Sequence, residues 1–525
     1  MQRRSERHQG HHAFTIPTLP SIGAEAPFLE ILTACWTKAR RGGADGADAR
    51  FRKLVRGRLL VSEDVLESLF DGIDALGHYA TAALGDEDAI DEEEAALEAS
   101  RPLFEARTQQ RLSRIDAEVT VVRCRECEQM AESQGFRART WRSGFGEVRL
   151  ARRYNYCSVC RTGRALAQEK VGLGKDAHTP RLAESVTRLA TVVPYNMAVS
   201  LAESLVGAEV SVRAAERLIA ERAEHVSMHA AEEARTLGPF DHKGLQRRIY
   251  RPLDAVKNAP RTAYLEMDGV FVMTREEDIA RRQPVEPGAR GGKGRRYDME
   301  GREVKNAILY TGAACTAESD KRNCLLDKRY VSHLGNWQDF ARRVWPALIR
   351  ERFDQAGRLV VLSDGARWIR DLCEWLPVKT QMILDLFHVK HRIWDTARAL
   401  HIDDDKAANR WAREQIARVE AGDARAVVES LRFLKPKREA AGKSADELRT
   451  YLSNNLDRMD YPTYRGEGLR VGSGAIESAN YHVTGGRLKL QGMRSSELGA
   501  ADMALLRTDL MNGAWRERTR EMLAA

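Results

Sequence analysis

Three acidic residues at the ends of apolar segments are the side chains best placed to do chemistry. Asp268 lies in the run TAYLEMDGVFVM, two residues after Glu266, and Asp364 closes the run LVVLSDGA. Such runs predict buried strands, in which Glu266 and Asp268 share one face. Glu477 follows a Gly-Ser-Gly turn and is expected on the first turn of a helix. Buried carboxylates need a compensating charge, and hard oxygen ligands select Mg²⁺ or Mn²⁺.

The alternative for these acids is structural, with each carboxylate half solvated at a strand end or paired with an arginine. Recurrence of the pattern favours the metal site formed by Asp268, Asp364 and Glu477. Glu477 is preferred as the third ligand because a helix is a rigid element that can face two strand ends. The other downstream acids are expected beside a histidine, in a loop or on a solvated helix face: Asp385, Glu467, Glu497 and Asp502.

The strongest local signal is a pair of CxxC motifs, CREC and CSVC. The 29 residues between Cys127 and Cys157 alternate in character and are broken by turns, which predicts a β-hairpin. Two cysteine knuckles joined by a hairpin are typical of a zinc ribbon, in which four thiolates form a closed structural site. The predicted zinc ligands are Cys124, Cys127, Cys157 and Cys160. Disulfides or incidental spacing are the alternatives.

Basic residues suggest three surfaces for a polyanion. The hairpin is rich in arginine, including Arg142, Arg149 and Arg152, which suits phosphate contacts but also suits a solvated β-surface. Three short helical patterns follow the linker VGLGKDAHTP and resemble a helix-turn-helix or an ordinary three-helix packing. In the first case Arg213 and Arg217 lie on the presented face. Near the C-terminus a basic segment with Lys489 and Arg494 leads into a final amphipathic helix.

Composition limits the class of protein. The chain has 525 residues, 43% hydrophobic and 30% charged, with a net charge of +8. This length predicts three or four domains, and the charge favours a polyanionic partner. No segment approaches the length needed to span a membrane, and the N-terminus lacks the apolar core of a signal peptide. A cytoplasmic protein without a membrane partner is therefore expected.

The order of the elements predicts the fold. From residue 260 the patterns read β, β, β, α, β, α, the order of an RNase H-like α/β domain, in which the first and fourth strands are neighbours. The 112 residues between Asp364 and Glu477 are too many for a loop, and residues 391–461 are nearly all helical by pattern, which together predict an all-α insertion. The expected regions are a disordered tail (1–23), a helical N-terminal region (24–118), the zinc ribbon (119–172), a helix-turn-helix-like region (173–240), a first catalytic part (260–390), the insertion (391–465) and a second catalytic part (466–525).

Taken together, these motifs resemble those of bacterial insertion-sequence transposases of the DDE type, specifically the ISKra4-like family. The resemblance covers roughly residues 120 to 515 and is most specific in GSGAIES and RLKLQGMRSS. It implies an RNase H-like catalytic domain, two Mg²⁺ or Mn²⁺ ions per active site, and cutting and joining of double-stranded DNA. Asp268, Asp364 and Glu477 match the acidic triad. Ser495 departs from the family pattern, where tryptophan is expected, which puts only local packing or DNA contact in doubt.

The resemblance also implies a partner and a role for one histidine. The partner is double-stranded DNA, as transposon ends and target, bound by at least a dimer near the bacterial nucleoid. Asp385 and His388 match a DxxH pair shared with Mutator-like transposases. His388 is expected either to touch the scissile phosphate or to form a structural hydrogen bond with Asp385. A nuclease or resolvase without joining activity, and a DNA-binding regulator with a relic catalytic domain, are the rival functions.

Overall fold

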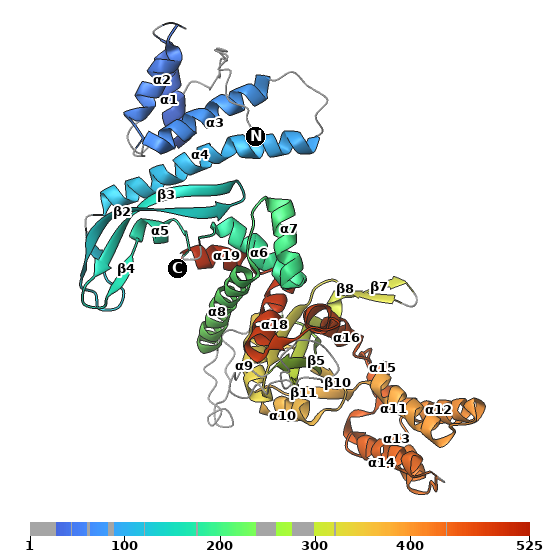
Figure 1. The fold of residues 1–525 in the computed structure, drawn as a ribbon. Helices are drawn as coiled ribbons and strands as arrows, with labels where there is room; N and C mark the ends of the chain where they lie inside the picture. Colours follow the sequence, from blue (N-terminus) through green and yellow to red (C-terminus); the bar gives the residue numbers. More distant parts are fainter. Residues whose placement is uncertain are drawn as a thin grey trace, which may run out of the picture. The chain divides into compact units, whose positions relative to one another are not determined.

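The structure, a computed structural model, is of a mixed α/β protein (Figure 1). It describes residues 28–41, 43, 45–59, 63–81, 89–119, 121–174, 177–237, 259–275, 299–319, 322–436 and 438–524. The predicted N-terminal tail and most of the basic, glycine-rich segment 275–302 lie outside these ranges. The chain divides into two compact units, residues 1–218 with 519–525, and residues 219–518. None of the described helices is long and apolar enough to cross a membrane.

The first unit begins with the predicted helical region. Its helices are α1 (Phe28–Arg40), α2 (Ala47–Arg56), α3 (Glu63–Thr81) and α4 (Ala89–Glu118). Apolar residues spaced three and four apart, such as Phe51 and Val55, place one face of each short helix in a common core. The acidic residues that follow position 88 lie in helix α4.

A four-stranded antiparallel sheet follows, in the order β1-β2-β3-β4. Its strands are β1 (Val122–Arg123), β2 (Met130–Ser143), β3 (Gly146–Cys157) and β4 (Thr162–Arg164). The predicted hairpin is confirmed as β2 and β3, which pair from Ser143 and Gly146 at the turn. Trp141, Val148 and Leu150 are buried in one core with Leu112 of α4. Helix α4 therefore supports the cysteine-bearing sheet.

Helices α5 (Leu166–Lys170), α6 (Pro180–Val192), α7 (Tyr195–Val206) and α8 (Val212–Leu237) come next. Gly207, with φ +65°, ends α7 in the left-handed conformation that glycine adopts without strain. Helices α6, α7 and α8 correspond to the three predicted helical patterns, but α8 is not short. Helix α8 has 26 residues because its apolar spacing continues beyond Ile219. The last helix is therefore longer than the sequence indicated, and the helix-turn-helix-like role of this region stays a prediction.

The second unit contains the central mixed sheet, in the order β11-β10-β5-β6-β9. Strand β10 (Leu359–Ser363) is parallel to both β5 (Ala263–Arg275) and β11 (Thr380–Leu384). Strand β6 (Met299–Thr311) is antiparallel to β5 and to β9 (Arg329–Leu334). The predicted adjacency of the first and fourth strands is confirmed. A separate hairpin, β7 (Cys315–Ser319) with β8 (Arg322–Leu325), was not expected from the sequence.

Helices cover both faces of this sheet. Helices α9 (Trp337–Arg350) and α10 (Arg367–Trp375) pack on the face that carries Leu265 and Met267. The opposite face, with Tyr264 and Leu362, shares one apolar core with the helices after β11. Those helices are α11 (Leu386–Leu400), α12 (Asp405–Glu420), α13 (Ala424–Arg432), α14 (Glu439–Ser453) and α15 (Tyr461–Gly466) (Figure 1). The all-α insertion is confirmed, although its first helix begins at Leu386, directly after β11.

The C-terminal segment returns to the sheet. It contains α16 (Gly474–Ala479), a π-helical turn η6 (Asn480–Gly485), α17 (Gly486–Leu488), β12 (Ser495–Ser496), α18 (Glu497–Met511) and α19 (Trp515–Ala524). Strand β12 pairs with the far end of β5. The prediction of a final amphipathic helix is wrong in two respects. Helix α18 buries polar Thr508 and Asp509 as well as apolar residues, and α19 follows it.

Candidate active site and metal centre

The four predicted cysteines come together. The sulfur atoms of Cys124, Cys127, Cys157 and Cys160 all lie within 4.8 Å of one another, and those of Cys127 and Cys157 are 3.7 Å apart. Tetrahedral zinc with Zn–S bonds of about 2.3 Å places its sulfur ligands about 3.8 Å apart. The cluster therefore has the dimensions and the ligand type of a structural zinc site.

Two similar turns form this cluster. In each CxxC motif the residue after the second cysteine, Glu128 or Arg161, has a positive φ, 58° and 55°. Backbone N–H groups of the turn, chiefly that of Cys127, lower the pKa of the Cys124 thiol to about 6. Hydrogen bonding with Cys127 raises the pKa of Cys160 to about 12. The Cys160 thiol therefore resists ionisation beside its neighbours, and a bound cation would remove that resistance.

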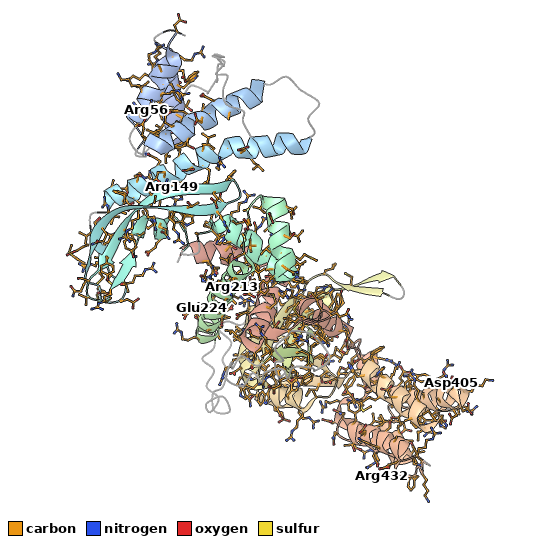
Figure 2. The ribbon with its side chains drawn as sticks, viewed as in Figure 1. Arg56, Arg149, Arg213, Glu224, Asp405 and Arg432 are labelled. Atoms are coloured by element: carbon orange, nitrogen blue, oxygen red, sulfur yellow. The ribbon has the colours of Figure 1, made fainter. Side chains whose placement is uncertain are left out.

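The arginines of the hairpin do not form one exposed set. Arg149 on β3 is exposed (Figure 2). Arg142 is partly exposed and donates to the carbonyl of Glu209 at 2.9 Å. Arg152 is buried, and its Nε donates to Oε1 of Gln168 at 2.9 Å. The prediction that Arg152 contacts DNA is therefore wrong for this structure, because its side chain is used inside the ribbon.

The other predicted DNA contacts are accessible. Arg213 lies at the beginning of α8 and is exposed (Figure 2). Arg217, one turn further along α8, is also exposed. Lys489 and Arg494, which lie between α17 and β12, are also exposed.

The two predicted aspartates lie at neighbouring strand positions. Leu362 of β10 is opposite Glu266 of β5, so two residues further on Asp364 emerges beside Asp268. The side chain of Asp364 accepts from the backbone N–H of Ala366 at 2.9 Å. Asp268 accepts from the N–H of Gly269 at 2.7 Å and from Nδ2 of Asn480 at 2.6 Å. Both carboxylates are therefore oriented by donors before any ion is bound.

The charges at this position repel one another. Burial, with added repulsion from Asp364 and Glu477, raises the pKa of Asp268 to about 6. Glu477 lies in the first turn of α16 as predicted, and its side chain is 53% exposed. A buried acid with a raised pKa, close to two further carboxylates on the ends of rigid elements, is typical of functional sites.

The side chain of His388, on helix α11, lies between two acidic residues, Asp385 and Glu477. Its Nδ1 is 2.5 Å from Oδ2 of Asp385, and its Nε2 is 3.7 Å from Oε1 of Glu477. The hydrogen bond with Asp385 raises the pKa of His388. The predicted structural hydrogen bond is confirmed. The same histidine also faces Glu477, so the two predicted roles do not exclude each other.

The three carboxylates are more widely spaced than the cysteines. Within the described ranges, only the cysteine set brings three or more ligand atoms within 4.8 Å of one another. The carboxylate oxygens of Asp268, Asp364 and Glu477 are ligands that suit a hard divalent cation. In their present positions, however, the three carboxylates cannot all bind the same ion. Because the side chain of Glu477 is half exposed, a change in its rotamer requires no repacking of the core.

Three residues of the site were given no role from the sequence. Asn480 binds Asp268, and its spacing of three from Glu477 could have placed it on the same helical face. Tyr451 of the insertion donates to the backbone carbonyl of Asp364 at 2.8 Å, which no local pattern indicates. Glu266, expected to share a face with Asp268, is fully buried, and burial raises its pKa to about 7.

A comparison of the chain with protein-family models gives no match. A comparison with curated proteins also gives none.

Proposed function

We propose that this protein is a DDE transposase with an RNase H-like catalytic domain, which binds the terminal inverted repeats of an insertion sequence and cuts and joins DNA. The observation that carries the proposal is the strand register that brings Asp364 beside Asp268. In the strand order β9-β6-β5-β10-β11 the first and fourth strands of the domain, β5 and β10, are neighbours, as expected for that fold. An all-α insertion before the third acid also agrees with the ISKra4-like resemblance.

The acidic residues have distinct roles in this proposal. Asp268, Asp364 and Glu477 would hold two Mg²⁺ or Mn²⁺ ions, which supply activation of water or a DNA 3′-hydroxyl and stabilise the leaving oxygen. Asn480 orients Asp268, and the backbone N–H of Ala366 orients Asp364. His388, with a raised pKa, brings a proton or positive charge to the exposed edge of Glu477, where the scissile phosphate would lie.

DNA binding is assigned to exposed basic residues in both units. A structural zinc ion would fix the β2–β3 hairpin, which presents Arg149. Arg213 and Arg217 on α8, and Lys489 and Arg494 near α17, add further positive charge. Contacts of this kind release counterions from DNA, so end binding should weaken steeply as salt increases.

The test uses the purified full-length protein with DNA containing the inverted repeats that flank its gene. We expect cleavage at the repeat ends and joining to a target plasmid, both dependent on added Mg²⁺ or Mn²⁺. Cleavage without joining would favour the nuclease or resolvase function. Specific end binding with neither reaction, at any divalent metal, would favour a DNA-binding regulator.

A further inference from the structure

Helix α16, which carries Glu477, does not use its own N-cap side chain. Ser473 occupies the N-cap position, and a serine there ordinarily accepts from the N–H three residues later, here that of Ile476. The Ser473 hydroxyl makes no such bond. It donates instead to Oδ2 of Asp385 at 2.8 Å, and the Ser473 backbone N–H donates to Oδ1 of Asp385 at 3.1 Å.

The N–H of Ile476 has a distant partner as well. It donates to Oε2 of Glu266 at 2.9 Å, in addition to a contact with the Ser473 carbonyl within its own turn. The helix that presents Glu477 is therefore attached by carboxylates from two strands of the central sheet. Glu266 comes from within β5 and Asp385 from the end of β11.

Glu266 is itself held firmly. Its Oε1 accepts from the hydroxyl of Tyr310 on β6. The Tyr310 ring stacks on that of Tyr264, with ring centroids 5.1 Å apart. The Arg470 guanidinium lies 5.6 Å from the centroid of the Tyr310 ring. Glu266 is 0% exposed, so it cannot contact DNA or a solvent-borne ion without rearrangement of the core.

A buried carboxylate is costly compared with an apolar side chain of similar size, so its retention calls for a gain elsewhere. Both donors to Glu266 are fixed by the sheet or by α16, and the N–H of Ile476 immediately precedes Glu477. We propose that Glu266 is a positioning residue: together with Asp385 it sets where α16 lies on the sheet, and so where Glu477 lies relative to Asp268. The consequence for cleavage rests on the proposed function, whereas the attachment of α16 does not.

The test compares Glu266→Gln with Glu266→Leu. Glutamine can accept from Ile476 through its oxygen and donate to Tyr310 through its amide nitrogen, whereas leucine can do neither. We expect near wild-type cleavage from Glu266→Gln and a loss of about 100-fold from Glu266→Leu, as misplacement of a catalytic group by about 1 Å produces. DNA-end binding should be unchanged in both. The Mn²⁺ affinity should fall only in the leucine variant.

Hydrogen exchange at the Ile476 amide provides a readout independent of catalysis. It should be slow in the wild type and in Glu266→Gln, and faster in Glu266→Leu. If the wild type does not cleave DNA, the proposed function fails while the exchange data still decide the attachment. Normal cleavage and an unchanged Ile476 exchange rate in Glu266→Leu would overturn the positioning role.

Ser473→Ala is the second variant, in case Glu266→Leu does not fold. It removes the hydroxyl bond to Asp385 and leaves the sheet core untouched. We expect faster Ile476 exchange and a several-fold loss of cleavage, with normal end binding. Wild-type exchange and wild-type cleavage in this variant would also contradict the proposal.

Discussion

The four-cysteine cluster and the acidic site both gather ionisable ligands, but they do so in opposite ways. The cysteines lie within 36 positions of one another in the chain and are joined by a single hairpin. Their sulfur atoms already lie at the spacing that one ion requires. The acids span 209 positions and come from the ends of two strands and from a helix. Asp268 and Asp364 are held by hydrogen bonds to protein donors.

If both sites bind metal as proposed, the ion at the cysteines would stabilise the fold and the ions at the acids would serve the reaction. Among the residues that the structure describes, only Ala131 joins the four cysteines in their apolar cluster, so the sulfurs have little other apolar support. The acidic site rests on a sheet with helices packed on both faces. Loss of metal should therefore disrupt structure at the cysteines and only activity at the acids.

The largest expected effect is at the cysteines. Replacing the buried Cys157 with serine should abolish zinc binding and unfold β1 to β4, because zinc in small structural sites contributes an apparent free energy of about 10–16 kcal/mol. Elemental analysis should find one zinc per wild-type chain and none in the variant. Cys324→Ser, outside the cluster, is the control and should keep its zinc. Wild-type protein that is folded, free of zinc and oxidised at these cysteines would contradict the prediction that they bind a structural zinc ion.

The acids should show the reverse behaviour. Asp364→Asn retains an acceptor for the Ala366 N–H, and Glu477→Gln retains its shape, so neither should lower the melting temperature or the zinc content. Each should reduce cleavage and strand transfer by about 10³-fold or more, the size of effect seen when a preorganised charge is removed from an active site. Glu497→Gln, an exposed acid on α18, is the matched control. Near-normal cleavage by Glu477→Gln in Mg²⁺ would show that another acid is the ligand.

His388 tests whether a structural role and a catalytic role can be separated in one residue. His388→Ala should lower stability by about 1–3 kcal/mol, because the buried Asp385 loses one of its donors. It should also slow cleavage, because His388 faces Glu477. Thermal unfolding and single-turnover cleavage measure the two effects separately. A variant that melts earlier but cleaves normally would leave His388 with a structural role alone.

The smallest effects are expected from single arginines, and two on one strand make a matched pair. Arg149→Ala should leave stability unchanged and lower the slope of log affinity against log salt by about 1. Arg152→Ala should instead destabilise the ribbon, because Arg152 is buried against Gln168. Equal salt slopes for Arg149→Ala and the wild type would remove this face from DNA binding.

A substitution of Arg213 tests whether the start of α8 recognises the DNA sequence as well as the DNA backbone. Arg213→Ala should weaken binding to the inverted repeats more than binding to random DNA of equal length. Competition binding at fixed salt measures the ratio. Equal losses on both DNAs would mean that the start of α8 contacts only the backbone.

How far the sequence predicts this structure depends on whether the determining contacts are local. The CxxC spacing and the alternation of the hairpin are local, and they predicted the cysteine cluster. Strand patterns likewise placed Asp268 and Asp364 together, because the order of strands restricts the possible topologies. Arg152 was misassigned because its partner, Gln168, belongs to a different element, and alternation alone does not reveal which arginine turns inward. Helix α18 was mistaken for amphipathic because Thr508 and Asp509 are polar yet buried.

The contacts that complete the acidic site are the least predictable part. The bonds of Ile476 to Glu266 and of Asn480 to Asp268 each join residues more than 200 positions apart. The hydroxyl of Tyr451 reaches the Asp364 carbonyl from inside the insertion. No pattern in one sequence indicates such pairs, although the i+3 spacing of Asn480 from Glu477 offered a partial signal.

The late position of α16 in the chain has a consequence during protein synthesis. When the ribosome has produced both aspartates and the whole insertion, the nascent chain still lacks Glu477, Asn480 and the Ser473 turn. If these groups act together as proposed, a growing or prematurely terminated polypeptide can contain the cysteine knuckles and the basic hairpin and still be unable to cut DNA. Such a fragment could occupy transposon ends without breaking them, so that incomplete translation would yield a competitor of the full-length protein rather than a source of chromosome damage.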